Sequence, residues 1–280
     1  MCGRRFVVVH LLLTLPATGC ATRATSGRGE PADWTVQTDA RYLYGEVRGK
    51  LQTPTGGNPG TTSPNRPTLK ELGFDHAGAW DVSATGALGD HRIYAGYRML
   101  RLSGASTLDD PLVSQGRSFP AGTRVGADVT LDWLRAGYAH RFDVDLPGDA
   151  LPDLALYPAI GVAVLDFDYR LRQPGPGDVH RSYVLPTPQI GLGAEWPLTS
   201  SLTLVATGLT SVPVGSEPRI DSAEISVRQR VLERDRLEVE AMLGVAYDRI
   251  RYNDDARQTV PNDVDVRFGP ALVAGLSIHF

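Results

Sequence analysis

Three side chains in the second half of the sequence have the types that nucleophilic catalysis requires. His180 and Ser182 flank Arg181, and Glu195 follows further along the chain. A serine hydroxyl becomes a good nucleophile when a histidine accepts its proton and a carboxylate orients that histidine. The alternation of the surrounding residues, however, places Glu195 on the opposite strand face from Ser182. A polar loop end before a strand is therefore the favoured interpretation, and a serine hydrolase site is the alternative.

Other catalytic and cofactor motifs are absent from the sequence. It contains no HExxH metal motif, no Walker loop, no Gly-x-Ser-x-Gly elbow and no dinucleotide fingerprint. The two cysteines, Cys2 and Cys20, lie in the leader region, so the body of the chain can form neither a disulfide nor a thiolate metal site. The formal net charge of −4 argues against nucleic acid as a partner. We therefore expect no cofactor, no metal and no nucleic acid.

Charged and amide side chains recur at alternate positions of several segments. In a closed β-barrel such positions share one lumen, which in a narrow barrel is usually filled by paired charges and water. A hydrogen-bonded polar plug is the favoured interpretation, and a conducting or ligand-binding channel is the alternative, for which the acidic excess would favour cations. The residues expected to face the lumen are Asp81, Asp128, Asp132, Arg141, Gln189, Glu195, Glu238, Glu240, Asp248, Asp265 and Arg267.

The last seventeen residues show this alternation most clearly. A period of two predicts a strand, and the segment exceeds the ~9–11 tilted residues that cross a bilayer. The face expected to contact lipid carries Val264, Val266, Phe268, Pro270, Leu272, Ala274, Leu276, Ile278 and Phe280. The aromatic carboxy-terminus resembles the signal that bacterial outer-membrane barrels present to their insertion machinery. That resemblance assigns the signal to Phe268, Leu276, Ile278 and Phe280.

Further alternating segments bring the expected number of strands to ten, with eight and twelve as alternatives. The clearest lie at residues 125–142, 182–197 and 237–248, and weaker ones lie at 33–51, 76–88, 91–103, 154–171, 201–211 and 219–231. Near Trp133 the apolar residues change face, which predicts a β-bulge. Short connections mostly alternate with long ones, a pattern typical of barrels with short periplasmic turns and long outer loops. The expected fold class is all-β: a closed antiparallel up-and-down transmembrane β-barrel over residues 33–280. A soluble β-sandwich or a lipocalin-like barrel is the alternative.

The amino-terminal segment has the layout of a secretory signal peptide. Arg4 and Arg5 precede a short apolar stretch, and small residues then lead to Cys20. We expect a signal peptide at residues 1–19 and a flexible periplasmic tether at residues 20–32. The segment at 17–20 is similar to a bacterial lipobox, except that Ala17 replaces the usual leucine. Two interpretations remain open: acylation of Cys20, which would make the protein a lipoprotein, and ordinary cleavage at the same bond.

Several short motifs resemble those of a group of small, largely uncharacterised outer-membrane β-barrel proteins of Gram-negative bacteria, within the OmpA/OmpW-like superfamily. They cover about residues 68–142, and the terminal strand is a second match. These motifs lie at residues 72–75 (LGFD), 91–94 (HRIY), 102–104 (LSG), 119–124 (FPAGTR) and 132–138 (DWLRAGY). The resemblance implies the barrel fold and an outer-membrane location, and it carries no catalytic residues. His180, Ser182 and Glu195 loosely resemble the site of outer-membrane lipid A deacylases.

The sequence therefore favours a non-enzymatic outer-membrane barrel with a structural role in the envelope or a narrow, porin-like passive pathway for small solutes. A lipid-modifying enzyme of the lipid A deacylase type and a surface adhesin or receptor acting through the outer loops are the alternatives. The expected partners are outer-membrane lipids, lipopolysaccharide and the barrel-insertion machinery. Fold alone does not choose among these functions.

Overall fold

The chain forms two compact units, residues 1–34 and residues 35–280, in a computed structural model. The structure describes residues 24–25, 31–32, 34–52, 68–114, 117–144, 154–173, 178–212, 214, 218–235, 237–253 and 263–280. In the first unit, β1 (Ala24–Thr25) pairs with β2 (Pro31–Ala32) within the expected tether. The expected signal peptide and Cys20 lie outside the described residues.

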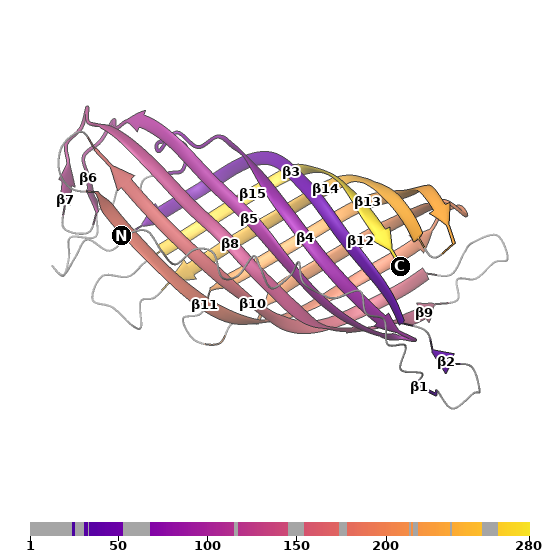
Figure 1. Cartoon of the computed structure of the whole chain (residues 1–280). Coiled ribbons are helices and arrows are strands. Elements are labelled where there is room, and N and C mark those ends of the chain that lie inside the picture. Colours follow the sequence, from indigo (N-terminus) through magenta and orange to yellow (C-terminus); the bar gives the residue numbers. More distant parts are fainter. Residues whose placement is uncertain are drawn as a thin grey trace. The chain divides into compact units, whose positions relative to one another are not determined.

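The second unit is a closed antiparallel barrel of ten long strands, which confirms the expected fold class and strand number (Figure 1). Each strand pairs with its neighbours along the chain, and pairing of β10 with β11 closes the ring. The strands are β3 (Trp34–Gln52), β4 (His76–Leu88), β5 (His91–Thr107), β8 (Arg124–His140), β10 (Leu154–Arg172), β11 (Val179–Pro197), β12 (Leu202–Ser211), β13 (Arg219–Arg234), β14 (Leu237–Asn253) and β15 (Asp263–His279).

The barrel has two different ends. At the turn end, short connections at residues 89–90, 198–201 and 235–236 join neighbouring strands. This end also holds β9 (Phe142–Val144), which pairs with the start of β10. The loop end carries the long connections, including the hairpin of β6 (Leu112–Ser114) and β7 (Arg117–Phe119). Figure 1 shows β9 and the β6–β7 hairpin at opposite ends of the barrel.

The interior of the loop half is filled by apolar side chains, which we call the apolar plug. Its largest members are almost fully buried, and several come from the loops rather than the strands. Backbone hydrogen bonds fix the loop segment 68–75 against β3, from Leu69 N to Gly49 O and from Val47 N to Asp75 O, each 2.9 Å long. The plug includes Leu43, Val47, Leu51, Leu69, Leu72, Phe74, Leu100, Phe119, Leu131, Trp133, Leu165, Phe167, Tyr169, Ile250 and Phe268.

Strand β8 runs through both halves without a bulge, which corrects the expectation near Trp133. Its pairing with β5 and β10 is continuous along the strand. The inward positions are apolar up to Trp133 and then continue with Arg135, whereas Leu134 and Tyr138 lie on the outer face. The apolar residues change face because the loop half buries them inside and the turn half displays them outside. The apolar residues of β8 therefore move from the inner to the outer face because the surroundings of the strand change, while the strand itself stays regular.

Strand β15 contains a bulge next to Pro270. Its register against β3 shifts between Phe268 and Ala271, where Gly269 has a φ of 119°, a value that favours glycine. Because the phase changes there, Phe268 points into the plug, while Leu276 and Phe280 lie on the exposed outer face. Phe268 therefore does not belong to the same face as the terminal residues, contrary to the expected insertion signal.

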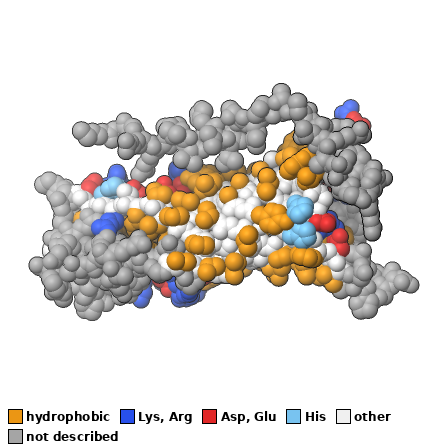
Figure 2. All heavy atoms as spheres, turned by 90° about the horizontal axis from the view of Figure 1, so that it is seen from below, with side chains coloured by type: hydrophobic (Ala, Val, Ile, Leu, Met, Phe, Trp, Pro, Cys, Tyr) orange, Lys and Arg blue, Asp and Glu red, His pale blue; other side chains and the backbone are white. Residues whose placement is uncertain are grey.

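The outer surface divides in the same way as the interior. From the turn end to the middle of the strands, large apolar side chains are exposed and form what we call the apolar belt. It includes Val82, Ile93, Ile160, Val162, Ile190, Leu192, Ile225, Leu243, Val245, Leu272 and Leu276. Figure 2 shows hydrophobic side chains over the middle of one side of the barrel, with charged and histidine side chains toward its ends.

Outside the plug, the outer surface of the loop half is charged, and we call this part the charged collar. It holds cross-strand ion pairs such as Arg172 with Asp128 and Arg249 with Asp265, the latter at 2.9 Å. Hydrogen bonds from the guanidinium of Arg249 lower the pKa of the Asp265 carboxyl. An apolar interior beneath a charged exterior is the arrangement of a barrel segment surrounded by water.

Candidate functional site

The most densely charged part of the interior lies directly beside the apolar plug. Asp81 of β4 has no exposed surface, and its carboxylate accepts hydrogen bonds from three arginines. Arg98 Nε donates at 2.7 Å, Arg135 Nη2 donates at 2.9 Å, and Arg41 donates to the other carboxylate oxygen. An isolated buried carboxylate would be strongly destabilising, so this threefold pairing is what allows Asp81 to lie inside the barrel.

Two further carboxylates balance the three arginines. Arg41 Nη1 donates to Glu224 Oε1 at 2.8 Å, and Arg98 Nη1 donates to Asp248 Oδ2 at 2.5 Å. The guanidinium carbon of Arg98 also lies 5.5 Å from the ring centre of Trp133, a cation–π distance that joins the charges to the plug. We call these six ionised residues the central network. They come from six strands, so the network connects the barrel wall across the lumen.

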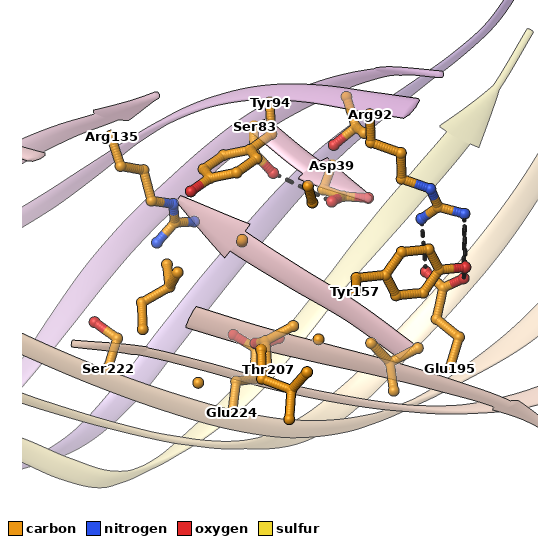
Figure 3. Close-up of a pocket in the computed structure, with 18 of the residues that line it drawn as sticks. Asp39, Ser83, Arg92, Tyr94, Arg135, Tyr157, Glu195, Thr207, Ser222 and Glu224 are labelled. Atoms are coloured by element: carbon orange, nitrogen blue, oxygen red, sulfur yellow. Dashed lines mark hydrogen bonds and ion pairs between the residues drawn. The ribbon is translucent and has the colours of Figure 1, made fainter. Parts of the chain in front are cut away.

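A second ionic group lies closer to the turn end. Arg92 contacts Glu195 at 3.3 Å and donates to the hydroxyl of Tyr157 at 2.8 Å, and that hydroxyl donates to Glu195 at 2.7 Å. The guanidinium of Arg92 also lies 3.9 Å from the Tyr157 ring centre. Figure 3 shows these three side chains converging on one side of a hollow.

The hollow is a cavity of about 190 Å³, which we call the chamber (Figure 3). A second cavity of about 170 Å³ adjoins it, because both are lined by Arg92, Glu195 and Arg228, among others. The second cavity also contacts Thr35, near the start of β3, and His279, the last residue of β15. Both of these positions belong to the turn end. The lumen is therefore filled in the loop half and hollow in the turn half.

Six of the residues expected in the lumen occupy inward positions of their strands. Asp81 and Asp248 belong to the central network, and Glu195 binds Arg92. The remaining three are Gln189, Glu238 and Glu240, of which Glu240 contacts His279 at 3.1 Å. Five of these six residues lie in the segments with the clearest alternation, and Asp81 lies in one of the weaker segments.

The other five expected lumen residues lie elsewhere. Four belong to the charged collar, because the apolar side of their strand segments faces the plug. These four are Asp128, Asp132, Asp265 and Arg267. The fifth, Arg141, lies in the connection between β8 and β9, where its Nε contacts Asp143 at 2.7 Å. These residues were expected in the lumen because every polar strand face was assigned to the interior. That assignment is correct only where the outer face of the strand is apolar.

The arginines of the interior were not predicted from the sequence. Arg41, Arg92, Arg98, Arg135 and Arg228 all line the chamber. They stand at alternate positions of segments with weak apolar alternation, or beyond the change of face in β8. Following the period through both halves of each strand would have found them. The described interior thus lacks the acidic excess that would favour cations.

The residues considered for catalysis are not brought together. His180 and Ser182 occupy outward positions of β11 near the loop end, and His180 Nε2 lies 2.8 Å from Asp168 Oδ2. Glu195 lies inside the barrel near the turn end, bound to Arg92. Among the described residues no group of three or more histidine, cysteine or acidic side chains could hold a metal ion, and no helix is long and apolar enough to cross a membrane.

Neither a known protein family nor a curated protein matches this sequence. Three solved structures show similar arrangements of strands. The outer membrane protease OmpT from Escherichia coli is 12% identical, with a TM-score of 0.45 over 90% of this chain and 99% of that chain. The attachment invasion locus protein Ail of Yersinia pestis is 8% identical, with a TM-score of 0.35 over 88% and 99%. Neisserial surface protein A is 12% identical, with a TM-score of 0.31 over 89% and 98%.

Proposed function

We propose that this protein is a non-enzymatic outer-membrane β-barrel with a structural role in the envelope, and that its lumen does not conduct. The observation that carries the second part is the apolar plug, in which large side chains such as Phe119, Trp133, Phe167 and Phe268 are at most 1% exposed. A narrow passive pathway would require these side chains to move apart. Solutes that enter the lumen from the turn end are therefore stopped by the close-packed side chains of the apolar plug.

The membrane location rests on the outer surface and on the terminal strand. A closed barrel has no free edge, and its apolar belt would be a costly surface in water. Lipid removes that cost, while the charged collar extends the loop half into the aqueous surroundings. The signal-peptide layout and the exposed Phe280 agree with export and insertion by the barrel machinery. Outer-membrane lipids and lipopolysaccharide are the partners that this location implies.

Conductance recordings test the proposal directly. We expect the refolded protein to give no stepwise openings in a planar bilayer, because the plug spans the loop half of the lumen. A general porin reconstituted in the same lipid provides the positive control. Resistance of the protein to denaturation by detergent without heating shows that the sample is folded. Reproducible openings from the folded protein would contradict the non-conducting lumen.

Replacement of Ser182 tests the enzymatic alternative. We expect Ser182→Ala and the parent protein to leave the acyl chains of lipid A equally intact, because Ser182 and Glu195 lie on opposite faces of β11. Mass spectrometry of lipid A after incubation measures any deacylation. Activity that is present in the parent protein and absent from Ser182→Ala would establish a serine hydrolase instead.

A further inference from the structure

The chamber is closed on one side and accessible on the other. The plug and the central network separate it from the loop end, and the adjoining cavity reaches the first residues of β3 and the last residue of β15. Among the described residues, the turn end is therefore the side from which a solute would enter the chamber and by which it would leave. Such a hollow suits binding rather than passage.

The wall of the chamber is more basic than the interior as a whole. The five arginines that line it have five carboxylates nearby, but only Asp39, Glu195 and Glu224 also reach the cavity surface. The other two, Asp81 and Asp248, are at most 1% exposed and lie behind the arginines. Arginines therefore outnumber carboxylates at the surface that a bound solute would contact, which favours an anion.

Three hydrogen-bond donors on residues that line the chamber have no acceptor among the described residues, and the first of them is the Nε of Arg41. The Nε of Arg228 is buried without a hydrogen-bond partner. The Nη2 of the same side chain lies 4.0 Å from the Oδ2 of Asp39. The hydroxyl of Tyr94 is also buried without a partner. This hydroxyl lies over Gly137 and Gly161, which leave the space that it occupies, because a Cβ added to either glycine would lie 2.5 or 2.8 Å from its oxygen. Buried donors of this kind usually have a bound acceptor.

We propose that the chamber binds a small oxyanion, a carboxylate or phosphate compound that enters from the turn end. Arg228 supplies the charge, Tyr94 supplies a neutral donor, and Arg92 forms the entrance beside Tyr157 and Glu195. Arginine matches this chemistry because its planar donors pair with the two oxygens of a carboxylate or phosphate. The chamber is smaller than the ~300–1,000 Å³ of pockets for drug-sized molecules, which limits the ligand to a small solute.

Isothermal titration of the refolded full chain in detergent micelles tests this binding. Inorganic phosphate and succinate serve as separate probes, because they distinguish the two sources of oxyanion, and choline serves as a cation of comparable size. We expect one of the two anions to bind at a single site and choline not to bind. Arg228→Gln should weaken that binding at least about tenfold, because it removes a charge-assisted hydrogen bond. Tyr94→Phe should weaken it less, because a neutral donor is lost.

Arg172→Gln is the matched control, since it removes the same charge from the outer collar, where Arg172 pairs with Asp128. It should bind the anion as the parent protein does. Far-ultraviolet circular dichroism establishes that each variant is folded before titration. The proposal is overturned if folded parent protein binds neither anion, if Arg228→Gln binds as tightly as Arg172→Gln, or if choline binds as well as the anions. None of these outcomes depends on whether the barrel conducts.

Discussion

Replacing Asp81 with asparagine is expected to lower the free energy of unfolding of the barrel by about 3–5 kcal/mol, the usual cost of removing one partner of a buried ion pair. The substitution keeps the size of the side chain and removes its charge. Arg98, Arg135 and Arg41 then lose a shared counter-ion that has no exposed surface of its own. Urea unfolding in lipid vesicles, followed by tryptophan fluorescence, measures the change.

Two further variants make this prediction specific. Asp128→Asn removes a carboxylate whose partner, Arg172, is about half exposed, so it should change the stability by about 0.5 kcal/mol or less. Adding Arg135→Gln to Asp81→Asn restores the balance of charge, since the ion pair described for Arg135 is with Asp81. The double variant should recover part of the lost stability. Equal effects of Asp81→Asn and Asp128→Asn would show that the central network does not stabilise the fold.

Replacing Trp133 with alanine is expected to cost about 3–5 kcal/mol, because truncation of a fully buried aromatic side chain leaves a cavity that its neighbours fill only partly. Trp133 is 1% exposed and lies where the apolar plug meets the guanidinium of Arg98. Its removal therefore weakens both the packing of the plug and the contact with the central network. The same urea titration gives the loss of stability.

Trp80→Ala provides the control for this second prediction. Trp80 is the same residue type, lies on the outer face of β4 and is 55% exposed. Lipid or detergent can occupy the space that its side chain leaves, so the loss of stability should be clearly smaller than for Trp133→Ala. If the two variants lost equal stability, the interior of the loop half could not be the packed core that the structure describes.

The terminal strand illustrates how far the sequence could be taken. Strict alternation from residue 270 onward predicted a strand whose apolar face, with Leu272, Leu276 and Phe280, is exposed, and the structure places these residues on the outer surface. Upstream of the bulge the same alternation continues with Val266 and Phe268, but these side chains are buried in the plug. The even-numbered residues of β15 stay apolar along the whole strand, but the bulge moves them from the inner face to the outer face of the barrel.

The central network illustrates what could not be predicted. Asp81 was expected inside the barrel from its position in a strand, but its partners stand on other strands. The hydrogen bond from Arg41 to Glu224 joins residues 183 positions apart, and that from Arg98 to Asp248 joins residues 150 positions apart. Such pairs depend on the closure of the barrel and on the register of every strand between them. No local spacing in the sequence records either quantity.

The sequence by itself determined that this chain forms a closed antiparallel barrel. The period of two and the short turns are local properties that each segment shows by itself, and the even number of segments suits a closed antiparallel barrel. The tertiary structure alone decided which face of each segment lies inside. Alternation separates an apolar face from a polar one, yet the apolar face turns inward where the barrel surrounds its own core and outward along the apolar belt. Which of these applies depends on the contents of the lumen, and those come from loops and strands far apart in the chain.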